Sequence, residues 1–207
     1  MRKTDNYALS RDRAQEYFLG FDQEKMIARW KLKADEKYLY AAFLGREYKV
    51  CRKSGKVIRQ DGSIAQFEET LSIFDFLCHE GEEKHLAGVY APVNSLKGTP
   101  PSVGVGTDFY GKTARRFDAD PEGFCRACKA LGAQQISMGD LAFQFPVFAD
   151  MTVVLKFYFS DEDFPASVTL LWDYNTLDYL FYETVFYAAG ALLHFILEEM
   201  DKSKAET

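Results

Sequence analysis

Three apolar runs follow one another in the last third of the chain. The first ends at Phe148, the second spans Met151–Phe159, and the third spans Ser167–Trp172. Each has the length and the aromatic and β-branched content of a strand, and short polar turns separate them. We therefore predict three consecutive antiparallel strands.

A long apolar segment, Tyr179–Leu197, follows these strands and contains only Glu183 and His194 as strongly polar residues. It predicts a buried helix over Tyr182–Asp201 that covers one face of the sheet, with His194 in the core. A membrane span is the alternative, because such a span needs about 20 apolar residues. Both polar side chains would be costly in lipid, so the buried helix is favoured.

Helical spacing, turn residues and capping residues predict the elements of the first two thirds. They are two helices, a strand, a hairpin and two further helices: Ser10–Gly20, Asp22–Lys31, Lys37–Leu44, Glu47–Arg59, Ser63–Cys78 and Pro121–Leu131. Gly, Pro, Ser and Asn dominate Gly88–Gly111, which predicts a loop.

The order of elements has no regular alternation of strand, helix and strand. The predicted fold class is therefore α+β, with a mainly antiparallel sheet packed against a long C-terminal helix. We expect a single domain over residues 1–207, made of a helical segment (1–35), a basic β-hairpin region (37–60) and a core (63–207).

Composition fits a globular protein, since 47% of the 207 residues are hydrophobic and 15% are aromatic. The net charge of −6 is unevenly distributed. Residues 1–60 carry 15 Lys and Arg against 8 Asp and Glu, and the remaining residues carry 10 against 23. We expect the basic segment to pack beside acidic residues of the same domain, and nucleic acid is an unfavoured partner.

The N-terminus, Met1–Tyr7, has no apolar stretch behind its charges, so no secretory signal is predicted. Four cysteines in a chain of this length are too few for a disulfide scaffold. We therefore expect a cytoplasmic protein without a membrane segment.

Four carboxylates lie where the late elements end: Asp140, Asp173, Asp178 and Glu183. Carboxylates that meet in one pocket can bind a metal ion or act as acid and base. An Asp after a strand, or a Glu in the first turn of a helix, equally serves as a cap. Capping is favoured, and a catalytic site of Asp140, Asp173 and Glu183 is the alternative.

Residues Gly106–Thr113 match the phosphate-loop pattern G-x-x-x-x-G-K-[ST]. The candidate cofactor-binding residues are Gly106, Gly111, Lys112 and Thr113. A phosphate loop should follow a strand and open a long helix, but Pro100 and Pro101 precede this one and Asp118–Pro121 interrupts any helix after it. A surface loop is favoured over nucleotide binding.

Cys125 and Cys128 form a C-x-x-C pair on a predicted helix, where both side chains share one face. Such a pair can hold a metal ion or form a redox couple, but it supplies only half of a zinc site. Cys78, His79 and His85 do not complete it in a known spacing. Two buried core cysteines are favoured over a metal site.

Several short motifs recur in a fixed order: Gly132, Gly139–Asp140, Pro146, Asp163–Pro165, Leu171–Asp173, and Leu180 with Glu183. With them the chain, from Phe67 to Leu197, resembles a family of small cytoplasmic proteins of unknown function from anaerobic bacteria and archaea. Some of these relatives carry an iron–sulfur module in front of the domain. The resemblance implies no reaction, and Cys125 and Cys128 fall where relatives more often have small apolar residues.

The sequence favours a non-catalytic ligand-binding or accessory protein whose partner is a small molecule or a protein. Abundant aromatic side chains supply contact surface, and no nucleophile lies in a recognisable motif. By analogy with the family, the setting is redox or one-carbon metabolism of an anaerobe. The alternatives are the carboxylate-based enzyme and nucleotide binding at Gly106–Thr113. The sequence identifies no cofactor and no oligomeric state.

Overall fold

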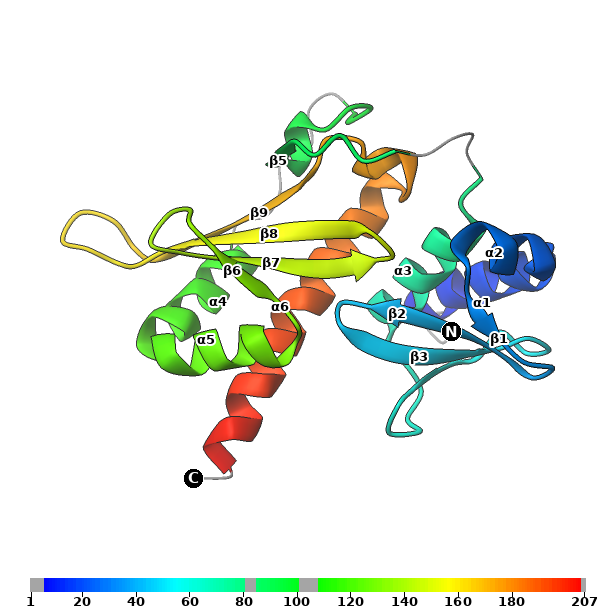
Figure 1. Cartoon of the computed structure of the whole chain (residues 1–207). Coiled ribbons are helices and arrows are strands. Elements are labelled where there is room, and N and C mark those ends of the chain that lie inside the picture. The colour runs from blue at the N-terminus through cyan, green and yellow to red at the C-terminus, as the bar shows by residue number, and fades with distance from the viewer. Residues whose placement is uncertain (1–5, 81–84, 101–107, 206–207) are drawn as a thin grey trace, which may run out of the picture.

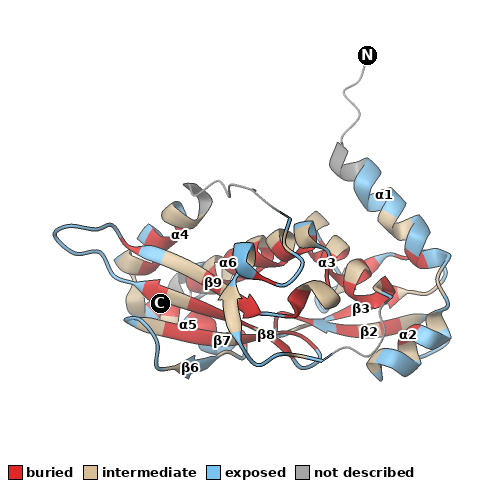
Figure 2. Cartoon of the chain, turned by 90° about the horizontal axis from the view of Figure 1, so that it is seen from above, coloured by how far each residue is buried: buried red, intermediate tan, exposed pale blue. Residues whose placement is uncertain are grey.

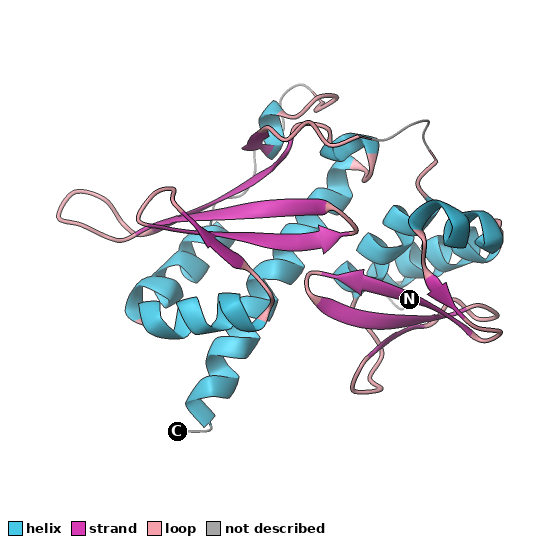
Figure 3. Ribbon diagram, viewed as in Figure 1, coloured by secondary structure: helices cyan, strands magenta, loops and turns pink. Residues whose placement is uncertain are grey.

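The computed structural model describes residues 6–80, 85–100 and 108–205 (Figure 1). Within these ranges the chain forms six α-helices and two antiparallel sheets. The predicted α+β class is confirmed, although the strands are divided between two sheets. Figure 3 shows both sheets and the helices around them.

The helices are α1 (Asn6–Leu19), α2 (Gln23–Trp30), α3 (Phe67–Cys78), α4 (Asp108–Ala119), α5 (Pro121–Ala130) and α6 (Tyr182–Ala205). The first sheet contains β1 (Lys33–Ala34), β2 (Tyr38–Phe43), β3 (Arg46–Cys51) and β4 (Val57–Arg59) in that order. The second sheet has the order β5-β9-β8-β7-β6. Its strands are β5 (Tyr90–Pro92), β6 (Gln134–Ile136), β7 (Leu141–Phe148), β8 (Met151–Tyr158) and β9 (Ser167–Asp173).

Helices cover one face of the second sheet, and a hydrogen-bonded polar group lies on the other face. Helices α4 and α5 place Phe117 and Phe124 against Phe157 of β8, with ring centroids 6.2 and 5.5 Å away. Helix α6 crosses the same face beside β9 (Figure 1). On the other face, Gln144 Nε2 donates to the hydroxyls of Tyr90 and Thr152, each at 2.8 Å. The predicted packing of the C-terminal helix against the sheet is confirmed.

The two sheets meet through the tip of the β2–β3 hairpin. Phe43 of the hairpin stacks on Phe148 of β7 with centroids 4.7 Å apart, and Phe148 stacks on Phe76 of α3 at 4.2 Å. The backbone N–H of Leu44 donates to the carbonyl of Val147 at 3.1 Å. We call α1–α3 with the first sheet the first half of the protein, and α4–α6 with the second sheet the second half. A contiguous hydrophobic core joins the two halves, and Figure 2 shows its buried residues in both sheets.

Helix α4 corrects the end of the expected loop, and its own end at Ala119 confirms the expected interruption at Asp118–Pro121. It begins at Asp108 and buries Ala114 and Phe117. The turn after α4 contains Asp120, whose side chain accepts the N–H of Gly123 at 2.9 Å and so caps α5. The segment predicted to break a helix is thus the corner between two helices, because each helix buries an apolar face on the sheet.

His194 of helix α6 was expected in the core, and the structure places it at the surface. Leu193 and Phe195 are buried on either side of it, but His194 itself is exposed. The last turns of α6 extend past the sheet, so only part of the helix circumference is covered there (Figure 1). Among the described residues no helix is long and apolar enough to cross a membrane.

Candidate functional site

The strand register separates two of the candidate catalytic carboxylates. Leu141 of β7 pairs with Phe157, whereas Trp172 of β9 pairs with Val153 near the other end of β8. Asp140 and Asp173 therefore lie at opposite ends of the sheet, roughly 20 Å apart along the strands. This geometry does not assemble the alternative to capping, a catalytic site of Asp140, Asp173 and Glu183.

Each of these carboxylates has separate surroundings instead. Asp140 accepts the N–H of Phe159 at 2.9 Å. Asp173 is buried and accepts three backbone N–H groups, from Ala87, Gly88 and Asn175, at 2.9, 2.7 and 2.9 Å. Asp178 pairs with Lys97 at 3.2 Å, and Glu183 is exposed in the first turn of α6. Asp173 thus ties the segment at Ala87 and Gly88 to the end of β9, Asp178 forms a surface ion pair, and Glu183 lies where a helix dipole favours a carboxylate.

The phosphate-loop pattern is divided by the start of α4. Gly106 lies outside the described residues. Gly111, Lys112 and Thr113 lie within the helix, after its first residue Asp108, and Thr113 is 2% exposed. A phosphate loop instead presents the amides at the very start of a helix, with its hydroxyl open to the metal ion. This position does not support a nucleotide site.

The two helical cysteines pack as core residues on α5. Cys128 is buried and Cys125 is half-buried, and burial raises the pKa of both thiols, which keeps them protonated near neutral pH. In the part of the chain that the structure describes, no three His, Cys, Asp or Glu side chains are placed to hold a metal ion. Metal binding therefore gains no support from the geometry.

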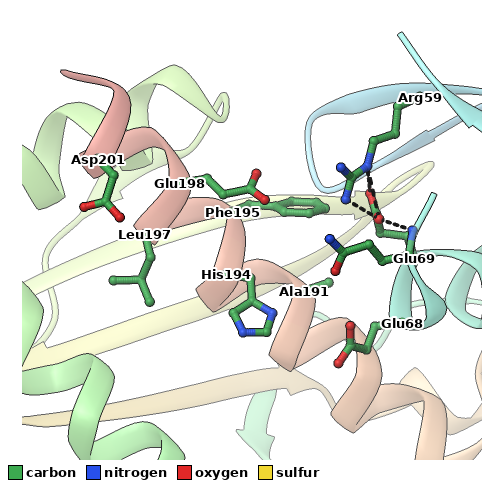
Figure 4. A pocket seen from close by; sticks show the side chains of 10 residues that line it. Arg59, Glu68, Glu69, Ala191, His194, Phe195, Leu197, Glu198 and Asp201 are labelled. Atoms are coloured by element: carbon green, nitrogen blue, oxygen red, sulfur yellow. Dashed lines mark hydrogen bonds and ion pairs between the residues drawn. The ribbon is translucent and has the colours of Figure 1, made fainter. Parts of the chain in front are cut away.

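A polar cleft of about 300 Å³ lies between β4, the start of α3 and α6 (Figure 4). Its buried Glu69 accepts hydrogen bonds from the Tyr48 hydroxyl, Arg59 Nη2 and the Gln66 N–H, each at 2.6 Å. Burial, together with the Glu69 carboxylate, raises the pKa of the Tyr48 phenol. The network is closed, since both Glu69 oxygens already accept donors.

A second ion-pair group lies on the other side of this cleft. Arg46 donates to Glu198 at 2.8 Å and to Glu199 at 3.0 Å, and its guanidinium lies 3.7 Å from the ring centroid of Phe195. These pairs place the basic hairpin beside acidic residues of helix α6. They tie the first sheet to α6, and their charges are mutually compensated.

A mostly apolar groove of about 310 Å³ lies between α1, α3 and the start of α6. We call it the α1–α3 groove, lined chiefly by Arg13, Tyr17, Leu71, Phe74, Asp75 and Phe181. The α1 and α3 residues recur at helical spacing, so each helix contributes one face. Phe18 stacks on Phe74 with centroids 5.0 Å apart and holds α1 on α3 at this place. Tyr17 and Phe181 are 58% and 61% exposed.

The carboxylate that lines the α1–α3 groove belongs to Asp75, whose side chain is 7% exposed. Its Oδ2 accepts the N–H of Phe181 at 2.7 Å. Its Oδ1 is 3.6 Å from His79 Nδ1 and accepts no hydrogen bond from any described residue. A buried polar atom without a donor costs about 1–3 kcal/mol, and more if it is charged. A donor on a bound molecule would recover this free energy.

A family model described as a domain of unknown function (DUF3786) matches residues 22–194. The chain belongs to the DUF3786 family. No curated protein and no solved structure matches the chain. The resemblance to a family of unknown function is thus confirmed, and the match begins earlier than Phe67, the start of the stretch over which the resemblance was expected. Helix α3 and Phe181 fall inside the DUF3786 match, whereas α1 lies outside it.

The sequence motifs did not identify the α1–α3 groove of this DUF3786 protein. One signal was present, because Asp75 lies within the apolar stripe of the predicted Ser63–Cys78 helix, next to Phe74 and four residues after Leu71. A charged residue in such a stripe is uncommon and favours a partner or a ligand. The partner helix α1 lies about 60 residues away, which no local pattern indicates.

Proposed function

We propose that this DUF3786 protein is a non-catalytic binding protein whose ligand is a small organic amine with an apolar body. The ligand lies in the α1–α3 groove. The observation that carries the proposal is Asp75, a carboxylate that lines the groove with a side chain only 7% exposed and whose Oδ1 accepts no hydrogen bond from the described residues.

The surroundings of Asp75 suit such a ligand. Ligand pockets are mainly apolar with a few polar groups, and the groove volume of about 310 Å³ is at the small end of their range. Leu71 and Phe74 can bury the apolar body, and an ammonium group can donate a charge-assisted hydrogen bond to Asp75. The exposed rings of Tyr17 and Phe181 can lie beside the cation.

The proposed setting is the cytoplasm of an anaerobe, where the protein is an accessory of redox or one-carbon metabolism. The family resemblance supports this setting by analogy. The four cysteines add support, since Cys51, Cys78, Cys125 and Cys128 are all free thiols, as is usual in a reducing compartment.

Isothermal titration calorimetry with phenethylamine tests the proposal. Phenethyl alcohol is the matched neutral ligand, because it has a similar shape but no charge. We expect the amine to bind about tenfold or more tightly than the alcohol, since a charge-assisted hydrogen bond contributes about 1.5–3 kcal/mol.

The variant Asp75→Asn removes the charge and keeps an oxygen for the Phe181 N–H. It should weaken amine binding by a similar factor, while Glu183→Gln, an exposed carboxylate outside the groove, should not. Circular dichroism melts establish that both variants are folded. Equal affinity for amine and alcohol, or unchanged amine binding in folded Asp75→Asn, would contradict the proposal.

A further inference from the structure

A second charged side chain lies at the same groove. Arg13 of α1 lines the α1–α3 groove and is exposed to solvent. Within residues 6–80, 85–100 and 108–205 it has no ion-pair or hydrogen-bond partner, although its neighbour Arg11 pairs with Asp12 at 3.7 Å. The groove therefore has a carboxylate side chain, Asp75, on the α3 wall and a guanidinium side chain, Arg13, on the α1 wall.

We infer that the ligand is an apolar α-amino acid, bound as its zwitterion, an inference that rests on the proposed function. The ammonium group donates to the Asp75 carboxylate, and the carboxylate of the ligand accepts from the Arg13 guanidinium. A guanidinium presents its donors in a fork that matches a carboxylate, which makes this pair specific for that group. The two charges of the ligand thus meet complementary charges on opposite walls.

The side chain of the amino acid is identified by the remaining surface of the groove. Leu71, Phe74 and the rings of Tyr17 and Phe181 offer apolar contacts, and Phe74 is buried below them. A charged side chain would lose water there without gaining a partner, whereas an aromatic or branched aliphatic one would bury apolar surface. The inferred ligand class is therefore phenylalanine-like or leucine-like amino acids.

The groove residues fall partly inside and partly outside the segment that the DUF3786 family model matches. Asp75 and Phe181 lie within residues 22–194, the DUF3786 match, whereas Arg13 and Tyr17 belong to α1 outside it. Recognition of the amine is therefore a property of the matched domain. Recognition of the carboxylate is supplied by the preceding helix.

Calorimetry with L-phenylalanine and phenethylamine separates this inference from the proposed function, because the amine lacks only the carboxylate. In the parent protein we expect L-phenylalanine to bind about tenfold more tightly than phenethylamine. In Arg13→Gln this advantage should disappear, while the affinity for phenethylamine stays the same. Arg11→Gln is the matched control on the same helix, and it should keep the advantage.

The outcomes are distinct. If phenethylamine binds but L-phenylalanine binds no better, or if Arg13→Gln keeps the advantage, the amino-acid inference is wrong and the proposed function stands. If neither compound binds the folded parent protein, both are wrong. If, in addition, the protein elutes as a dimer that Phe181→Asp converts to a monomer, the groove is covered by a second copy of the chain.

Discussion

Gly45, at the tip of the β2–β3 hairpin, gives the sharpest prediction about how the two halves fit together. Its φ of +75° lies in the left-handed region, which L-residues rarely adopt. A Cβ atom placed there would lie 2.3 Å from the carbonyl oxygen and 3.1 Å from the carbonyl carbon of Leu131, at the end of α5. Gly45→Ala must therefore move either the hairpin or the end of that helix.

The expected loss of stability has two parts. A left-handed backbone costs an alanine roughly 1–2 kcal/mol. The contact with Leu131 involves main-chain atoms, which cannot rotate away, and overpacking of this kind costs about 1–3 kcal/mol. Gly45→Ala should thus lose about 2–5 kcal/mol, the sum of the two parts. Gly62 is the matched control, because its φ is +87° and no atom lies within 4 Å of the place that a methyl group would take, so Gly62→Ala should lose only the first part.

Urea unfolding measures both variants. Trp30 lies in α2 of the first half and Trp172 in β9 of the second, so fluorescence of single-tryptophan versions reports each half. We propose that the chain is one folding unit, and both probes should then give one transition. The midpoint of Gly45→Ala should lie about 1–2 M below that of the parent. Equal losses for Gly45→Ala and Gly62→Ala would refute the close contact, and separate transitions would refute the single unit.

Three further predictions concern buried polar groups and thiols. Glu69→Gln, which removes the carboxylate at the centre of the closed network, should lose about 1–3 kcal/mol of unfolding free energy in urea; a loss of a few tenths would contradict its role. Near neutral pH, iodoacetamide should modify Cys51 first, because a hydrogen bond from Ser54 lowers the pKa of its thiol. Buried Cys128 should react only after unfolding, and equal modification rates of the two cysteines by mass spectrometry would count against this. Burial raises the pKa of Cys78 from 9.0 to about 12, so the folded thiol keeps its proton at alkaline pH values at which the unfolded thiol loses it. The parent should therefore lose up to roughly 1.4 kcal/mol per pH unit in this range beyond the loss of Cys78→Ala, and parallel pH profiles would refute this.

The elements that local chemistry determines could be predicted from the sequence. Asp22 and Asp120 are caps, as their positions before helices predicted, and their side chains accept the N–H groups of Lys25 and Gly123 at 3.2 and 2.9 Å. The long strands of the second sheet followed from apolar runs. The local sequence pattern did not predict helix α4, because Gly111 lowers the helix propensity of this segment. In the structure, the burial of its apolar face against the sheet outweighs this low propensity.

Several contacts between distant segments could not be predicted from the sequence. The strands β1, β5 and β6 have two or three residues each, too few to show a period, and pairing with longer strands holds them. His194 is exposed because α6 continues past the sheet, which the apolar composition of the helix does not reveal. The α1–α3 groove depends on where the tertiary fold places α1.

The central claim, that the α1–α3 groove binds a small amine through Asp75, is tested most directly by following backbone amides with NMR during a phenethylamine titration. The Phe181 N–H donates to Asp75 Oδ2 and so reports on that carboxylate. We predict saturable shifts of Phe181, Tyr17 and Leu71, and their loss in Asp75→Asn. Shifts confined to the polar cleft around Glu198, or no shifts at millimolar amine, would contradict the claim.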